Sequence, residues 1–236
     1  MTRDRLVIAV DGPAGAGKGA ICRWVAIRFG LEYLETGALY RVVGLLSLRE
    51  GGLTADPERL ARLARSMPFS CRLDQNRFES LLDGIDVSDQ LRREDVAMEA
   101  SKVAALGAVR SALKDFQRYH GGKQDIILDG RDIGTVVWPE AQRKIFLTAS
   151  VEERAKRRAL ELQERGETVN LPRVLEEMKL RDARDMGRTH APLLPAEDAV
   201  VVDTTHMSLD ESRHRVAALI EPLVHQRRTN RSFPTQ

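Results

Sequence analysis

The chain has 236 residues, 42% of them hydrophobic, which is enough for one substantial core and predicts a single globular domain. Its 37 basic and 35 acidic residues nearly cancel, so no overall field attracts a nucleic acid polymer or a membrane surface. The two cysteines, Cys22 and Cys71, lie outside any Cys/His cluster in the sequence, which argues against structural zinc and for a reducing compartment. Because no apolar run approaches the roughly 18 residues that span a bilayer, we expect a cytoplasmic protein, and a monomer.

The first predicted element is a buried strand over 6–10, which leads through a glycine-rich loop into a helix. In the stretch VDGPAGAGKGA, Gly12, Gly15 and Gly17 allow several backbone N–H groups to point into one concavity at the start of the helix. Lys18 adds a positive charge beside that concavity. This context predicts a phosphate-binding loop; a glycine-rich turn without a ligand is the alternative.

A second turn from strand to helix follows in the stretch LETGALYR, over 34–41. Thr36 is a natural N-cap residue, and Arg41 comes about a turn and a half later. The helix N-terminus and the arginine could together bind a second anion. An ordinary cap beside a solvated arginine would explain the same residues.

The segment over 68–91 interrupts the alternation of buried strands and helices. Its polar and apolar residues alternate, and it contains the turn pairs Gln75-Asn76 and Asp83-Gly84, which predicts a small antiparallel sheet. Two helices are predicted after it, over 92–105 and 108–119. We therefore expect an insertion between two parts of the main sheet.

The next buried strand, over 125–129, runs into the motif LDGRDIGT. The charged residues Asp129, Arg131 and Asp132 come at the carboxyl end of this strand, the edge at which open α/β sheets bind ligands. Arg131 is a candidate to hold a phosphate, and Asp132 is a candidate to accept a hydrogen bond from the amino group of a base. A charged turn with an internal salt bridge is the alternative.

The C-terminal part continues the α/β pattern. Strands are predicted over 144–149 and 199–203, and helices over 151–165 and 209–224. A polar stretch with Gly, Asn and Pro, over 163–172, predicts a loop or hinge. Together with the earlier elements, this pattern predicts an open parallel sheet with helices on both sides.

Two further segments carry charge near the C-terminus. Arg181, Asp185 and Arg188 are spaced to share one helix face, and Arg184 lies round the helix from them. Such a face is usually an exposed, salt-bridged surface, so its spacing alone indicates no substrate. The last residues, 226–236, are polar and without a pattern, which predicts a frayed tail.

These motifs together resemble those of the bacterial cytidylate kinases, P-loop enzymes of the nucleoside monophosphate kinase group. The match extends over nearly the whole chain, through IAVDGPAGAGKG, ETGALYR, LDGRDIGTVVWP, KIFLTAS, the Arg/Asp-rich stretch before APL, and VVDTT. The resemblance implies a P-loop nucleoside monophosphate kinase fold, in which a CORE sheet carries a monophosphate-binding region and a short mobile LID. It also implies transfer of a phosphoryl group from ATP to CMP or dCMP, assisted by Mg²⁺.

The resemblance also divides the single kinase domain, 1–236, into working parts. The CORE would comprise about 1–60, 120–150 and 195–225, the monophosphate-binding region with its antiparallel insert about 61–119, and the LID about 160–175. The expected partners are then CMP, dCMP and ATP, with no nucleic acid polymer and no membrane.

Roles for individual residues follow from the same resemblance. ATP would be bound by Gly12, Pro13, Ala14, Gly15, Ala16, Gly17, Lys18, Gly19 and Ala20. The acceptor nucleotide would be bound by Thr36, Arg41, Ser101, Arg110, Arg131, Asp132, Arg181, Asp185 and Arg188. Of these, Arg41, Arg131 and Arg188 would hold the phosphate, Ser101, Arg110 and Asp132 the cytosine, and Arg181 and Asp185 the ribose. Lys18, Arg131 and Arg188 would be catalytic, and no protein residue is expected to ligate a metal ion or act as a nucleophile.

Two positions depart from the family pattern. Glu35-Thr36 stands where many members have Asp-Ser, a change that keeps a carboxylate and a hydroxyl. Ala20 stands where Thr or Ser is usual, so one hydroxyl contact to a nucleotide phosphate is missing.

Two other functions would use the same phosphate loop. A regulatory module or an inactive homologue would keep the loop but would gain nothing from the acceptor-side motifs. A phosphotransferase acting on UMP or AMP would keep the arginines and differ at Ser101, Arg110 and Asp132. The motifs that are present favour the kinase that acts on CMP.

Overall fold

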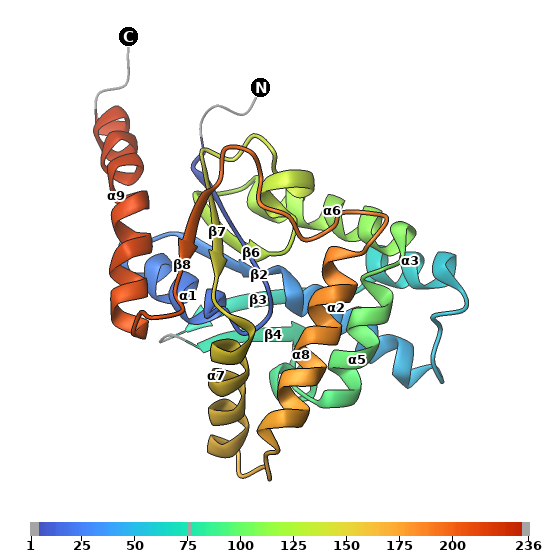
Figure 1. The fold of residues 1–236 in the computed structure, drawn as a ribbon. Coiled ribbons are helices and arrows are strands. Elements are labelled where there is room, and N and C mark those ends of the chain that lie inside the picture. The colour runs from blue at the N-terminus through green and yellow to red at the C-terminus, as the bar shows by residue number, and fades with distance from the viewer. Residues whose placement is uncertain (1–4, 75–76, 233–236) are drawn as a thin grey trace.

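The computed structural model describes residues 5–74 and 77–232. Its centre is a five-stranded parallel sheet with helices around it, and a three-stranded antiparallel sheet lies beside that core (Figure 1). The α/β fold predicted from the alternating apolar and amphipathic segments is therefore confirmed. Within the described residues, no helix combines the length and the apolar character needed to cross a membrane.

The parallel sheet brings the predicted strands together in a non-sequential order. From one edge to the other the strands are β2 (Glu32–Glu35), β6 (Ile126–Gly130), β1 (Val7–Asp11), β7 (Arg143–Thr148) and β8 (Val200–Asp203). Every residue of the central strand β1 is buried, as expected for a strand that is covered on both faces. In register, Asp11 pairs with Gly130 on one side and with Phe146 on the other, so the carboxyl ends of three strands meet at one edge.

Helices α1 (Lys18–Phe29) and α2 (Thr36–Arg49) pack against β6 of this sheet, while α3 (Pro57–Ser66) and α6 (Gly107–Gly121) pack against each other and against α2. The last helix, α9 (Leu209–Ser232), packs against α1. It continues well beyond the predicted end at 224, so the expectation of a frayed tail is wrong for 226–232, while 233–236 lie outside the described residues. The reason is tertiary: Arg227 pairs with Asp125, and Arg228 donates to the carbonyl of Phe29.

The insertion predicted over 68–91 is present as β3 (Phe69–Asp74), β4 (Arg77–Leu82) and β5 (Ile85–Asp86). The turn pair Asp83-Gly84 joins β4 to β5, and both residues have positive φ angles, 53° and 75°, as this tight hairpin turn requires. The other predicted pair, Gln75-Asn76, lies outside the described residues. Two helices follow, α4 (Ser88–Leu91) and α5 (Glu94–Val103), so the helix predicted from 92 is preceded by a separate short turn.

Two long helices project from the carboxyl edge of the sheet and lie side by side (Figure 1). They are α7 (Val151–Glu164) and α8 (Leu171–Met186), and the loop predicted from the Gly, Asn and Pro residues connects them. The side chain of Asn170 ends this loop by accepting a hydrogen bond from the backbone N–H of Arg173, 3.1 Å away, which caps α8. Pro172 occupies the first turn of α8, where a missing N–H costs nothing.

The contact between α2 and α5 depends on the absence of a side chain at Gly44. A Cβ atom at this position would lie 2.9 Å from the backbone nitrogen of Ala100 on α5. We therefore predict that Gly44→Ala lowers the free energy of unfolding by about 1–3 kcal/mol, since overpacking outweighs the gain in helix propensity. Gly37→Ala on the same helix meets open space and serves as the control. Equal stability of the two variants in denaturant titrations would contradict this explanation.

Candidate active site

The loop between β1 and α1 has the backbone of a phosphate cradle. Gly12 has a φ angle of 149°, and a Cβ atom there would lie only 1.9 Å from the carbonyl oxygen of Leu147. Gly17 has a φ angle of 86° and is the N-cap of α1 in the left-handed conformation. Because both positions require glycine, the loop can turn sharply and present its amides at the positive end of the helix.

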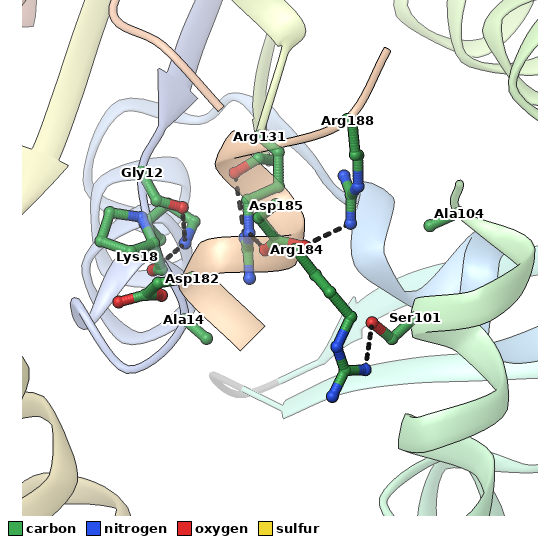
Figure 2. Close-up of polar contacts among 12 residues, drawn as sticks. Gly12, Ala14, Lys18, Ser101, Ala104, Arg131, Asp182, Arg184, Asp185 and Arg188 are labelled. Carbon is green, nitrogen blue, oxygen red and sulfur yellow. Dashed lines mark hydrogen bonds and ion pairs between the residues drawn. The ribbon is translucent and has the colours of Figure 1, made fainter. Parts of the chain in front are cut away.

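Lys18 lies inside this loop rather than in solvent. Its buried ammonium donates to the carbonyl oxygens of Gly12 and Pro13, both at 2.8 Å (Figure 2). Burial lowers the pKa of Lys18, nearby Arg131 lowers it further, and Asp129 opposes both effects. The ammonium is therefore held beside the cradle, where an anionic ligand would favour its charged form.

The position after this lysine is also shaped by its surroundings. A Cβ atom at Gly19 would lie 3.1 Å from Nη1 of Arg23, 3.6 Å from the hydroxyl of Tyr33 and 3.7 Å from Oδ2 of Asp129. Tyr33 itself donates to Oδ2 of Asp129 at 3.0 Å. Burial raises the pKa of Asp129, and neighbouring Glu35 raises it further. A hydroxyl side chain at Gly19 would therefore have to displace a group that already occupies this space.

Thr36 lies at the expected place but makes a different contact. It is the first residue of α2, and Glu35 is in the N-cap position that the sequence assigned to Thr36. The hydroxyl of Thr36 donates to the backbone carbonyl of Asp129 at 2.7 Å. This bond ties the start of α2 to the end of β6, so Thr36 joins two elements of the site instead of capping a helix.

Three arginines gather near one carboxylate. Asp185 of α8 accepts from Nε of Arg131 at 3.1 Å and also pairs with Arg188, as Figure 2 shows. Burial alone would raise the pKa of Asp185, but Arg131, Arg188 and Arg181 outweigh it and bring the pKa below its ordinary value. The sequence predicted one helix face for Arg181, Asp185 and Arg188, but α8 ends at Met186, so Arg188 lies just beyond the helix. Arg131 joins the group from the turn after β6.

The positive charge in this cluster exceeds what Asp185 can balance. Burial lowers the pKa of Arg181 to about 9, and the charge of Arg131 adds to this effect. The Nε atom of Arg181 is buried and has no hydrogen-bond partner. Arg41 donates to the carbonyl of Leu91 at 2.7 Å, and burial also lowers its pKa. Such a surplus of partly desolvated cations is suited to a multiply charged anion.

A second polar group lies in a cavity of about 580 Å³ beside this cluster. Arg110 of α6 forms a buried ion pair with Asp132, donates to the carbonyl of Ala104 at 3.0 Å, and lies over the ring of Tyr40. Asp132 therefore takes part in an ion pair, but its partner comes from another helix rather than from its own turn. Other polar residues that line the cavity are Ser111, Lys114, Thr189 and His190.

Ser101 stands apart from the ion pair of Arg110 and Asp132. It lies on α5 and accepts a hydrogen bond from Nη1 of Arg184 on α8, 3.4 Å away. Figure 2 shows Arg184 extending toward Ser101 and away from Asp185. The position of Arg184 round the helix from the other charged residues is confirmed, and it places this side chain between α8 and α5.

One well-connected residue was missed by sequence reasoning. Arg154 of α7 is buried and donates to the carbonyl of Ala149 at 2.9 Å and to that of Ala14 in the phosphate loop at 3.1 Å. It also forms a bidentate ion pair with Asp182 of α8, in which Nη2 donates to Oδ2 at 2.6 Å and Nη1 donates to Oδ1 at 3.2 Å. Its only sequence signal is an arginine in a charged helix, which is typical of an exposed surface.

Known proteins resemble this chain over nearly all of its length. The family model described as cytidylate kinase matches residues 8–222. A cytidylate kinase from Magnetococcus marinus is 50% identical over 222 residues, which cover 94% of this chain and 98% of that protein. Those from Vibrio parahaemolyticus and Saccharophagus degradans are 44% and 43% identical, covering 94% and 91% of this chain and 98% and 96% of theirs.

The similarity joins the two halves of the site. The matched residues 8–222 include the phosphate loop, the turn after β6 and the charged end of α8, which the fold brings to one edge of the sheet. With a family model that spans most of the chain and relatives at 43–50% identity, the chain belongs to the cytidylate kinase family.

Proposed function

We propose that this site transfers the terminal phosphoryl group of ATP to CMP or dCMP, which gives ADP and CDP or dCDP. Membership of the cytidylate kinase family supports this reaction. The observation that carries it is the register of the two central strands: Asp11, directly before the phosphate loop, pairs with Gly130, directly before Arg131. The charge of Arg131 also contributes to the lowered pKa of Lys18. Two phosphate groups bound by these cations would be neighbours, as phosphoryl transfer requires.

On the donor side, we assign the ATP phosphates to the loop from Gly12 to Ala20. The glycine backbone supports this role because its amides are free of Cβ atoms that would block a close approach. Lys18 would exchange its bonds with the loop carbonyls for bonds with the phosphates, and Arg131 and Arg188 would stabilise charge on the transferred group. No covalent intermediate is needed, since positioning and charge cancellation suffice.

On the acceptor side, we assign the phosphate to Arg41, Arg131 and Arg188. The arginine surplus around Asp185 supports this assignment, because bidentate arginines suit phosphate oxygens. Arg181 and Asp185 would meet the ribose, and Thr36 would support this pocket from the start of α2.

We assign the cytosine to the cavity that Asp132 and Arg110 line. Ser101 would contact the base from α5. A carboxylate can accept a hydrogen bond from the exocyclic amino group of cytosine, whereas uracil offers only a carbonyl oxygen at the same place. The ion pair with Arg110 fixes the orientation of the Asp132 side chain in this cavity.

Mg²⁺ fits a site of this kind even with few protein ligands. Among the described residues, no three acidic, His or Cys side chains lie close enough to hold a metal ion. The ion would therefore be held mainly by phosphate oxygens and water, the arrangement that Mg²⁺ commonly adopts with nucleotides. When bound, it would neutralise charge on the phosphates of ATP.

We also propose that different segments of the chain form the CORE, the monophosphate-binding region and the LID. The parallel sheet would be the CORE, about 61–119 would bind the monophosphate, and about 160–175 would act as a LID over the ATP phosphates. The position of α7 and α8 at the carboxyl edge supports the last role, because Arg154 links α7, α8 and the phosphate loop. The enzyme would act as a monomer in the cytoplasm on free nucleotides, and would bind neither nucleic acid polymers nor membranes.

The proposed reaction can be tested by measuring ADP release with ATP, Mg²⁺ and each of CMP, dCMP, UMP and AMP. We expect the highest kcat/KM with CMP or dCMP, because Asp132 and Arg110 are built for an amino-bearing pyrimidine. Faster release with UMP or AMP would point to a different acceptor. No release with any monophosphate would support the inactive homologue instead.

Asp132→Asn tests the recognition of the base. An amide can rotate to offer either a donor or an acceptor, so it would not discriminate against uracil as a carboxylate does. We predict that the ratio of kcat/KM for CMP to that for UMP falls at least about tenfold, while KM for ATP stays nearly constant. An unchanged ratio would remove Asp132 from this role.

Ala20→Thr tests the missing hydroxyl. A hydrogen bond from a hydroxyl to a charged phosphate contributes about 1.5–3 kcal/mol, or roughly 10- to 150-fold, when nothing replaces it. Because the backbone cradle and Lys18 remain, we predict an active natural enzyme in which the substitution improves ATP use several-fold, by a lower KM or a higher kcat. The acceptor preference should not change. A natural protein without activity that Ala20→Thr does not restore would mark the loop as a relic.

A further inference from the structure

Asp11 connects the phosphate loop to the turn that carries Arg131 and Asp132. It is the last residue of β1, directly before Gly12, and its side chain is buried. One carboxylate oxygen accepts from the backbone N–H of Ile133 at 2.8 Å, and the other accepts from that of Gly134 at 2.7 Å. These two amides come immediately after Asp132 and begin the π-helical turn η1 (Ile133–Val137).

This carboxylate satisfies donors that would otherwise be orphaned. The first N–H groups of a helical turn have no partner within the turn, and leaving them buried and unpaired is costly. The chain is also closely packed here: a Cβ atom at Gly134 would lie 3.1 Å from Cδ of Lys144 and 3.4 Å from Oδ2 of Asp11. The first residues of η1 are therefore held from one side by Asp11 and from another by the stem of Lys144.

The phosphate loop itself is fixed by other contacts. The backbone of Asp11 is held in the sheet between β6 and β7. Gly12 packs against the carbonyl of Leu147, and Lys18 bonds to the carbonyls of Gly12 and Pro13. None of these contacts uses the carboxylate, whose two hydrogen bonds described above both go to the acceptor turn.

We infer that Asp11 is a positioning residue, which fixes Arg131 and Asp132 relative to the phosphate loop and so sets the approach of the acceptor to the phosphoryl donor. This inference rests on the acceptor roles proposed above for Arg131 and Asp132. An in-line transfer depends on this distance and angle, and a shift of about 1 Å can reduce the rate by about 100-fold.

The ionisation of Asp11 is consistent with this role. Burial raises its pKa to about 6, the amides of Gly134 and Ile133 oppose that rise, Asp132 adds to it, and Lys18 opposes it. Above this value both oxygens are acceptors, so the two amides can be held together.

Asp11→Asn replaces one of the two carboxylate oxygens that accept from Ile133 and Gly134 with an NH₂ group. The amide NH₂ would face a backbone N–H, which removes one hydrogen bond and places two donors together. We expect kcat/KM for CMP to fall about tenfold or more and the CMP to UMP ratio to narrow, with KM for ATP within about twofold of the natural enzyme. Gly134→Ala should give the same pattern, because Gly134 supplies one of the two backbone N–H groups and its added Cβ would press on Asp11 and Lys144.

The matched control is Asp125→Asn. Asp125 also accepts from a backbone N–H, that of Leu6 at 2.9 Å, and pairs with Arg227, but it precedes β6 at the opposite end of the sheet. This control should lower the thermal midpoint without altering the CMP to UMP ratio. All variants are assayed well below their thermal midpoints, as followed by circular dichroism, so that lost activity is not lost fold.

The outcomes separate this inference from the proposed reaction. If the natural enzyme does not phosphorylate CMP, the proposed function fails whatever the variants do. If it does, two results would show that the positioning role is wrong. In one, Asp11→Asn impairs the binding of ATP, seen as a higher KM, as strongly as it lowers kcat/KM for CMP. In the other, it lowers the thermal midpoint without altering the CMP to UMP ratio, as Asp125→Asn does. If Asp11→Asn does not fold, Gly134→Ala decides: an unchanged CMP to UMP ratio in that variant overturns the inference.

Discussion

The structure depends on how several arginine side chains, all positively charged, are held close together at one edge of the parallel sheet. Arg131, Arg181 and Arg188 lie near a single carboxylate, Asp185, although they repel one another. Burial weakens their hydration, which lowers the pKa of Arg181 and of Arg188. A protein keeps such an arrangement only where the rest of the fold fixes it, and a multiply charged anion is what would relieve it.

The same balance explains the donor half of the site. Lys18 and Asp129 are both buried, and burial shifts their pKa values in opposite directions, each toward the neutral form. The carbonyls of Gly12 and Pro13 and the hydroxyl of Tyr33 hold the two side chains in place. Both groups are therefore held beside the phosphate loop before any nucleotide arrives, and Lys18 has only to exchange the loop carbonyls for the phosphates.

The sequence predicted what depends on local pattern, and missed what depends on distant contacts. The apolar runs located the sheet strands, and Asp83-Gly84 located a hairpin turn, because both follow from residues next to each other in the chain. Thr36 was assigned a cap it does not make, since its partner is the carbonyl of Asp129, which lies 93 residues away. The end of α9 was placed too early because its arginines bond to Asp125 and Phe29 rather than to one another. Arg154 carried no distinguishing signal at all.

Two of the contacts between distant parts of the chain lie at the phosphate loop. Arg154 ties the carbonyl of Ala14 to α7 and, through Asp182, to α8. Asp11 ties the strand that precedes the loop to the acceptor turn. The positions of α7 and α8 and of the acceptor turn are therefore both fixed relative to the phosphate loop. A reaction that needs two phosphates in line benefits most from rigidity at this point, because any error here would displace donor, acceptor and the helices above them together.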